Sequence, residues 1–415
     1  TGRNDWESQL AFSEASSFFY PSVGMSAVVS SMAKLPEWIS FLKVRGSYTE
    51  VGSSFERFIT RPSYQFNTAS GSWNSTTIYP ARNLKPEKTR SWELGINSKW
   101  LNNRLSFDLT YYRSNTINQT FTADLSISSG YSKAYIQSGS IRNEGIELAL
   151  GYSDKWGAFS WDSNLTFSCN NNKIMKLTEG ATNPMTGEPI NKDNYDMGQL
   201  GNLDARVKLY KGGSIGDVYA THRIKRDGNG HIFVSQDGDI EIESVDEFKL
   251  GSILPKANMG WSNNFSYKGI NLGVTLTARF GGIALSGTQS VLDQYGVSQK
   301  TADYRDAGGI AANYGYIDTE KYFDTVKGYA AYYTYSATNI RLAELNLSYT
   351  LPKEWFRDKL RMTVGLVGKN LWMIYCKAPF DPEATASTQS NYYQSYDYFM
   401  QPTTRNIGFS VKLNF

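Results

Sequence analysis

The 415-residue chain carries 28 Tyr, 21 Phe and 10 Trp, yet its mean hydropathy is negative, at −0.44. It has no run of roughly 18 apolar residues, which excludes a membrane-spanning helix, and its 42 Lys+Arg and 39 Asp+Glu form no long run of one sign, which excludes nucleic acid as a partner. Two cysteines, Cys169 and Cys376, and two histidines, His222 and His231, are too few for a disulfide framework or a metal centre.

Apolar and polar residues alternate in runs of about ten, which predicts β-strands with two different faces. Leu105, Phe107 and Leu109, for example, alternate with Ser106 and Asp108. We expect about eleven strands, near 18–30, 41–52, 89–101, 104–121, 141–153, 159–177, 257–267, 270–280, 339–352, 360–374 and 405–415.

The connections between these strands alternate in length. The short ones are 31–40, 102–103, 154–158, 268–269 and 353–359, and the long ones are 53–88, 122–140, 178–256, 281–338 and 375–404. Outer-membrane barrels have short periplasmic turns and long extracellular loops. The pattern therefore predicts an all-β, transmembrane antiparallel β-barrel in a bacterial outer membrane, with lipid around it, extracellular loops and a periplasmic C-terminus.

Aromatic residues gather where the short turns would lie. Rings with an apolar body and a polar edge are typical of the membrane–water interface. Ordinary core packing of a soluble β domain is the alternative. The residues expected in such a girdle are Trp100, Tyr152, Trp156, Trp161, Tyr267, Tyr349, Trp355 and Phe415.

The expected barrel is incomplete. Residues 1–6 do not resemble the start of a signal peptide, so we expect an N-terminal portion to be missing. Bacterial barrels have even strand numbers, and a count of eleven predicts at least one further strand upstream. The strand at 18–30 would otherwise expose unpaired backbone groups at the edge of the sheet.

Short motifs spread over nearly the whole chain resemble the C-terminal half of the barrel of SusC/RagA-type TonB-dependent transporters. Each motif is weak alone, but together, in this order, they are specific. They are Arg-Asn-Asp-Trp at 3–6, Phe-Tyr-Pro-Ser-Val at 19–23, Leu-Lys-Val-Arg-Gly-Ser-Tyr at 42–48, Leu-Lys-Pro-Glu-Lys-Thr at 84–89, Arg-Asn-Glu-Gly-Ile-Glu at 142–147, Gly-Gly-Ile-Ala-Leu-Ser at 281–286, Tyr-Gly-Val-Ser at 295–298, Ala-Thr-Asn-Ile-Arg-Leu at 337–342, Tyr-Thr-Leu-Pro at 349–352, Gly-Lys-Asn-Leu at 368–371 and Asp-Pro-Glu at 381–383.

The resemblance implies that residues 1–415 are half of a barrel of about 22 strands around a plug, the size given for outer-membrane transporters. It further implies import of a glycan or an oligopeptide, a SusD-like surface lipoprotein as partner, and energy from the TonB–ExbB–ExbD complex through the missing N-terminal part. No cofactor is implied. A passive porin or surface adhesin is the alternative, which the presence or absence of an upstream plug domain would decide. An enzyme is not expected, because no nucleophile, histidine and acid occur together in a supporting motif.

Tyrosines in the last two long connections are candidates for recognition. Aromatic rings beside amides and carboxylates suit a sugar or peptide ligand, and they equally suit a protein interface or simple loop packing. The candidates for contact with ligand or partner are Tyr304, Tyr314, Tyr392, Tyr393, Tyr396 and Asp397, with Tyr316, Tyr398 and Phe399 nearby.

Three further groups of residues have competing interpretations. Charged and amide residues on the strands could bind substrate in the lumen or simply pair across strands: Arg142, Asn143, Glu144, Glu147, Arg341 and Glu344. The segments 227–230 and 237–239 could bind calcium, but their spacing favours tight turns. The alternating residues Phe409, Val411, Leu413 and Phe415 resemble the signal read by the barrel-assembly machinery, and a girdle position for Phe415 is compatible with that role.

Overall fold

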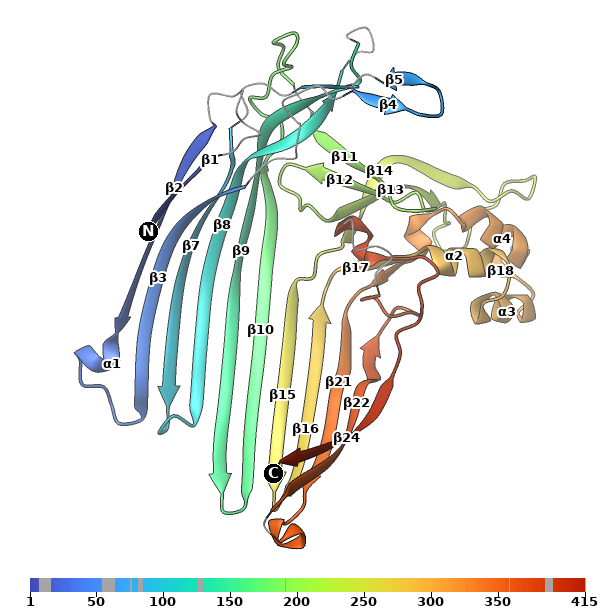
Figure 1. Ribbon diagram of the computed structural model, residues 1–415. Helices are drawn as coiled ribbons and strands as arrows, with labels where there is room; N and C mark the ends of the chain where they lie inside the picture. Colours follow the sequence, from blue (N-terminus) through green and yellow to red (C-terminus); the bar gives the residue numbers. More distant parts are fainter. Residues whose placement is uncertain are drawn as a thin grey trace. The chain divides into compact units, whose positions relative to one another are not determined.

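The computed structural model describes residues 1–6, 16–53, 64–74, 77–80, 85–125, 130–190, 192–357, 359–384 and 391–414. Its main feature is a sheet of long antiparallel strands, each paired with its neighbours in chain order (Figure 1). These wall strands are β1 (Gly2–Trp6), β2 (Ser17–Val28), β3 (Ile39–Ser53), β7 (Glu87–Trp100), β8 (Leu105–Asp124), β9 (Lys133–Trp156), β10 (Phe159–Lys176), β15 (Ala257–Tyr267), β16 (Ile270–Phe280), β21 (Asn339–Thr350), β22 (Arg361–Cys376) and β24 (Asn406–Asn414).

All eleven predicted strands are present, and β1 is a twelfth that the sequence analysis missed. β1 pairs with β2 from Gly2 opposite Pro21 to Trp6 opposite Ser17. The expectation that the strand at 18–30 forms the edge of the sheet is therefore wrong. The argument for an upstream strand from an odd count fails with it, because the count of eleven was one too low.

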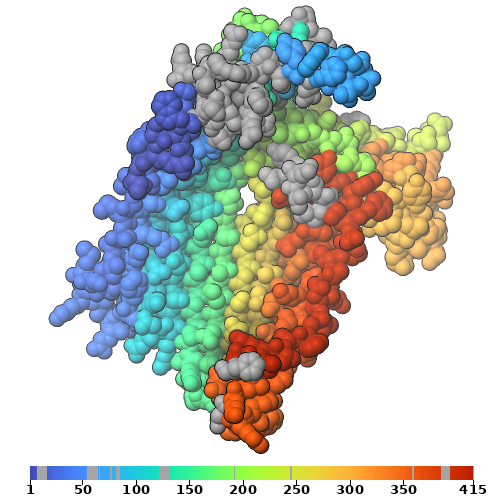
Figure 2. Space-filling view, in the orientation of Figure 1, coloured from blue at the N-terminus to red at the C-terminus, as the bar shows by residue number. Residues whose placement is uncertain are grey.

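The chain divides into two compact units. The first comprises Thr1–Leu148, Asn170–Tyr195 and Leu209–Ile215, and the second comprises Ala149–Cys169, Asp196–Lys208 and Gly216–Phe415. In the first unit, β2, β3, β7, β8 and β9 run as successive bands from blue to green in Figure 2. The second unit continues the wall from β15 to β24 and also contains a separately folded part.

Hairpins with few residues join the wall strands at one end of each unit (Figure 1). Lys268 and Gly269, between β15 and β16, both have positive φ, at 44° and 87°, as the favoured two-residue hairpin turns require. Asn102 and Asn103, between β7 and β8, also have positive φ, which asparagine tolerates better than most residues. The sequence thus has turn-forming residues at the positions where the wall reverses direction.

The longer connections, together with two of the short ones, fold into further elements, which the sequence analysis treated as loops. In chain order they are α1 (Val29–Met32), β4 (Gln65–Asn67), β5 (Ser72–Asn74), β6 (Ile78–Tyr79), β11 (Asn194–Gln199), β12 (Arg206–Tyr210), β13 (Asp217–Ile224), β14 (Ile242–Ser252), β17 (Ile283–Ser286), α2 (Gly287–Gln294), α3 (Gln299–Asp306), β18 (Ile310–Ala312), β19 (Gly315–Ile317), α4 (Thr319–Val326), η3 (Ala330–Tyr332), β20 (Thr334–Ser336), η4 (Lys353–Phe356), η5 (Asn391–Ser395) and β23 (Tyr396–Asp397).

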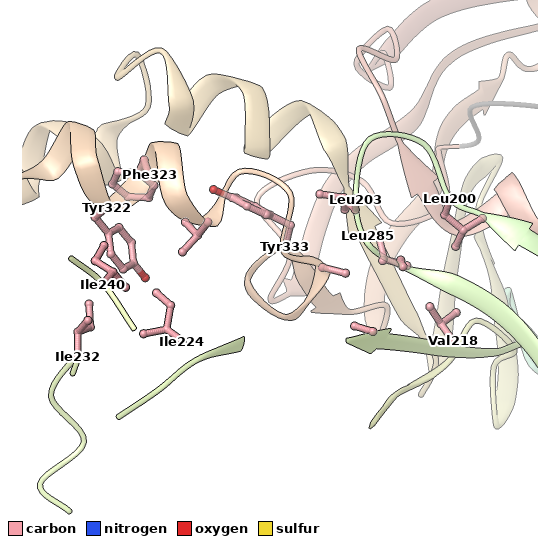
Figure 3. Packing of buried hydrophobic residues seen from close by; sticks show 14 of the residues in the cluster. Leu200, Leu203, Val218, Ile224, Ile232, Ile240, Leu285, Tyr322, Phe323 and Tyr333 are labelled. Carbon is pink, nitrogen blue, oxygen red and sulfur yellow. The ribbon is translucent and has the colours of Figure 1, made fainter. Parts of the chain in front are cut away.

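Within the second unit, the connection between β10 and β15 and the connection between β16 and β21 fold into one compact part, which we call the module. The strands before β15 and the helices after β16 share one hydrophobic core, which we call the module core. In Figure 3, Tyr322 and Phe323 of α4 lie beside Ile224, Ile232 and Ile240. The wall strands β15, β16, β21 and β22 contribute no buried residue to this cluster among those described. The module core is therefore internal to the connections and independent of the wall.

Side-chain caps mark where the three helices of this module begin. Ser286 accepts a hydrogen bond from the Gln289 amide before α2, and Asp318 accepts one from the Glu320 amide before α4. Such caps satisfy backbone donors that the first turn leaves free. In the part of the chain that the structure describes, no helix is long and apolar enough to cross a membrane.

Candidate functional site

The wall has one apolar and one polar face. In the β22–β24 pair, Leu366 lies opposite Phe409 and Val364 lies opposite Val411, while Gly365 and Ser410 share the other face. Phe409 is 83% exposed, and Met25 on β2 is 80% exposed. Large apolar side chains with this exposure, repeated along strands, are what a lipid-facing surface requires.

Aromatic pairs lie at both ends of the apolar face in the first unit. Trp38 and Trp100 make an edge-to-face contact with ring centroids 5.0 Å apart at the end with the short turns. Trp92 on β7 and Tyr111 on β8 make a similar contact at 5.7 Å further along the strands. The structure thus places Trp100 at the expected end and adds an upper pair, Trp92 and Tyr111, that the sequence analysis did not assign.

In the second unit two of the expected girdle residues, Tyr152 and Trp161, form an aromatic group with Phe265 at the short-turn end. Tyr152 contacts Trp161 at a centroid distance of 5.1 Å, and Trp161 stacks on Phe265 at 6.1 Å with planes 11° apart. The Trp161 indole donates to Asn263 Oδ1 at 3.1 Å. The remaining predicted members that lie among the described residues are exposed: Trp156, Tyr267, Tyr349 and Trp355.

The polar face of the first unit carries a charge-paired network. Arg45 donates to both carboxylate oxygens of Asp108, at 2.9 and 3.2 Å, and to the Thr110 hydroxyl at 2.6 Å. Asn97 donates to the same carboxylate at 2.9 Å. These groups come from three neighbouring strands and satisfy one another, so they form a rigid polar lining rather than a free binding group.

The polar residues in the middle of β9 do not all share one face, contrary to the expectation that they line a lumen together. Arg142 donates to Asn115 at 2.9 Å, and Glu144 lies 3.6 Å from the Arg113 guanidinium. Asn143, on the opposite face, accepts hydrogen bonds from two asparagines of β10. Strand alternation causes this separation. Arg142, Asn143 and Glu144 all pair across strands, which was the alternative interpretation of these residues.

On β21 the structure brings together a buried ionic cluster that sequence reasoning left ambiguous. Arg341 contacts Asp381 at 2.8 Å and Glu383 at 3.0 Å. The side chains of Arg341 and Asp381 are 11% and 7% exposed. The motif Asp-Pro-Glu at 381–383 was the only signal that could have indicated this partner. Glu344, by contrast, makes only a long contact, 3.9 Å, with Lys369.

Most of the candidate loop residues pack inside the second unit. Tyr304 and Tyr393 lie against the module core. Tyr396 is 2% exposed and its hydroxyl accepts from the Asn202 amide, while Asp397 accepts from the Ser286 hydroxyl at 2.6 Å. For these residues the structure favours the packing alternative.

Other candidates are exposed or not described. Tyr314 and Tyr316, on the β18–β19 hairpin, are the most exposed described members of the set, at 76% and 68%, and Tyr398 and Phe399 are exposed as well. The side chain of Tyr392 and all of Phe415 lie outside the described residues.

The two Asp-Gly segments are turns, as expected. The Asp227 carboxylate accepts from the backbone amides of Asn229 and His231, and these contacts lower its pKa although its partial burial opposes them. Gly230 and Gly238 have φ of 85° and 81°. Among the residues that the structure describes, no three acidic, histidine or cysteine side chains gather around a common point.

Comparison with known proteins decides the family. The model of the family described as "TonB dependent receptor-like, beta-barrel" matches residues 1–239, more than half of the chain. The chain belongs to the TonB-dependent receptor family. This is a family of outer-membrane β-barrel receptors and transporters, not of enzymes.

Individual relatives of this TonB-dependent receptor agree with the SusC/RagA resemblance. TonB-dependent receptor P3 of Formosa agariphila is 25% identical over all of this chain and 43% of that protein. TonB-dependent receptor SusC of Bacteroides thetaiotaomicron is 23% identical over 75% of this chain and 31% of that protein. The structure of the RagAB peptide transporter matches 99% of this chain and 44% of its own, with a TM-score of 0.73 and 18% identity. This receptor chain spans less than half the length of these relatives.

Proposed function

We propose that this chain forms part of the wall of an outer-membrane importer that takes up an oligosaccharide or an oligopeptide. The observation that carries the proposal is a twelve-strand antiparallel wall with one apolar and one polar face, in a chain of the TonB-dependent receptor family. We assign residues 1–415 to the C-terminal half of the barrel. The apolar face contacts lipid, and the polar face lines the lumen around a plug supplied by the rest of the protein.

The partners follow from the same proposal. A SusD-like lipoprotein closes the outer end of the barrel, and the TonB–ExbB–ExbD complex supplies energy from the periplasm. The solved RagAB structures, described as those of a peptide importer, support such a partner. The relatives include SusC and the RagAB peptide transporter, and the proposal covers both a glycan and a peptide as substrate.

The proposal also fixes an orientation, with the short turns in the periplasm and the module outside the cell. Cysteine labelling tests it in whole cells that express the full-length receptor with Cys169 and Cys376 replaced by serine. Gly238→Cys, on a module turn, should react with a membrane-impermeant maleimide, and Asn102→Cys, on a short turn, should not. Equal labelling at both positions would rule out the orientation.

Tyr314 and Tyr316 are the most exposed of the described candidates for contact with ligand or lipoprotein. We expect Tyr314→Ala/Tyr316→Ala to lower uptake or co-purification of the lipoprotein, because aromatic side chains dominate many interfaces. Tyr295→Ala, another exposed tyrosine of the same module, is the matched control. Unchanged lipoprotein binding together with unchanged uptake would remove the hairpin from the recognition surface.

An uptake assay separates the importer from a passive porin or adhesin. Cells with the full-length receptor should accumulate labelled oligosaccharide or oligopeptide only while TonB is functional. Membership of the TonB-dependent receptor family favours this outcome. Uptake that continues without TonB would indicate the passive alternative.

A further inference from the structure

Four basic side chains lie on the apolar face of the first unit, just beyond its upper aromatic pair. They are Lys88 and Arg90 on β7, Arg113 on β8 and Arg142 on β9. Along β7, Lys88 and Arg90 share a face with Trp92, Leu94 and Ile96, because strand residues two apart point the same way. We call these four residues the cationic row.

Strand pairing places the cationic row from the level of Trp92 to four residues beyond it along the wall. Trp92 lies opposite Tyr48 on one side and Arg113 on the other. One step further, Arg90 lies opposite Glu50 and Asn115. Arg142 joins this level through its hydrogen bond to Asn115. The row therefore follows the Trp92–Tyr111 pair across three adjacent strands.

The apolar face between the two aromatic pairs has the height of a lipid layer. Trp92 and Trp100 are eight residues apart on β7, which corresponds to about 27 Å along the strand. A strand tilt of roughly 35–45° reduces this to about 20 Å along the membrane normal, close to the apolar band of about 25 Å in outer-membrane barrels. The cationic row then lies where lipid headgroups begin.

Acidic neighbours only partly neutralise the row. Glu50 accepts from the Tyr48 hydroxyl at 2.8 Å and lies 3.0 Å from Arg90 and 3.6 Å from Lys88. Glu144 lies beside Arg113. Four cations against these two carboxylates leave an excess of two positive charges.

Arg142 is the member of the row with the fewest charged contacts. Among the described residues it has no carboxylate partner, and it donates a hydrogen bond to the neutral amide of Asn115. Its guanidinium can therefore accept an anion from outside the protein without first losing an internal ion pair. A planar guanidinium binds two phosphate oxygens well.

We propose that the cationic row binds the phosphate group of an outer-leaflet lipid. The acyl chains of that lipid would lie on the apolar face between Trp92 and Trp100, and its phosphate would contact Arg142, with the charge of Lys88 adding attraction at longer range. The proposal rests on the membrane-spanning role and the orientation given above. A free phosphate ion offers the same headgroup chemistry but no acyl chains for the apolar face.

The test uses the delipidated full-length receptor and counts lipid adducts by native mass spectrometry. The probes are lipid A, phosphatidylglycerol and the phosphate-free lipid digalactosyl diacylglycerol. Lys88→Gln/Arg142→Gln removes two cations. It leaves the ion pairs of Arg90 with Glu50 and of Arg113 with Glu144 in place. The matched control, Lys43→Gln/Lys99→Gln, removes two cations from the opposite face of the same wall.

We expect the double variant to bind the two phosphate-bearing lipids about 25-fold more weakly, because each basic residue near an anionic lipid surface contributes about fivefold. The control and the galactolipid should show no such change. Arg142→Lys, which keeps the charge, should recover most of the loss in the single Arg142→Gln variant. The ratio of lipid A to phosphatidylglycerol binding identifies the source of the phosphate.

Three results would overturn the proposal: equal loss in the control, no loss in the double variant, or displacement of the lipid by inorganic phosphate at equal concentration. Failure of the membrane-spanning role in the proposed function gives a different result. In that case the unaltered receptor would not form a heat-modifiable barrel in lipid at all, and no probe would bind.

Discussion

The module core offers a direct test of whether the module folds independently of the wall. Phe323 on α4 is 1% exposed. Its ring contacts Tyr322 and Tyr304, with centroids 5.0 and 6.0 Å away, and the Lys300 ammonium lies 5.4 Å from its centre. Replacement by alanine removes these contacts and leaves a cavity. Phe→Ala changes at such sites lower the free energy of unfolding by about 3–5 kcal/mol.

That cost raises the population of the locally unfolded module by roughly 100- to 4,000-fold. Limited proteolysis of the full-length Phe323→Ala receptor in lipid should therefore give faster cleavage within 287–338. The wall should stay intact, as judged by heat-modifiable migration on a gel. Tyr314→Ala, at an exposed position, should change stability by no more than about 0.5 kcal/mol. Loss of the barrel together with the module would refute the independence of the two.

Three further predictions concern other parts of the chain. Arg341→Gln leaves Asp381 buried without its cation, which should lower the free energy of unfolding by about 3–5 kcal/mol. Hydrogen exchange in 377–384 should therefore rise. Unchanged exchange would argue against a buried pair. Lys211, 2.6 Å from Glu179, and hydrogen bonds from backbone amides together lower the pKa of that carboxyl to about 2, so its stabilising effect should be present above pH 4.5 and be lost as the pH falls towards 2. The Leu177 amide donates to Glu179 at 2.7 Å, so hydrogen exchange at Leu177 should report this loss, and Lys211→Met should weaken the pH dependence. Deletion of Phe415 should reduce the heat-modifiable, membrane-inserted fraction, and an undiminished fraction would contradict an assembly role.

The wall could be predicted from the sequence because the pattern of apolar and polar residues that produces it lies within each strand. Lipid on one side and polar groups on the other impose a two-residue period on every long strand, and turn residues such as Asn102 and Gly269 mark the reversals. β1 was not predicted because its five residues, Gly-Arg-Asn-Asp-Trp, do not alternate between apolar and polar. Its place depends on pairing with β2, which no local pattern encodes.

The module could not be predicted because its contacts are distant in the sequence. Leu203, Val218, Leu285 and Phe323 share one core although they come from four separate segments. The strands that supply them are short, and their apolar residues are scattered among polar ones. Tyr396 shows the same limit for the candidate site. In the sequence it belongs to a polar, tyrosine-rich loop, and only the folded chain reveals that its ring is buried against α2 and β17.

The module's self-contained packing has a consequence for how such receptors diversify. Every buried residue of its core comes from the connections, and none of those described comes from the neighbouring wall strands. Recombination could therefore exchange the whole insertion as a cassette, leaving strand register and lipid contacts as they are. A lineage of receptors could in this way acquire new cargo while its membrane scaffold stayed the same.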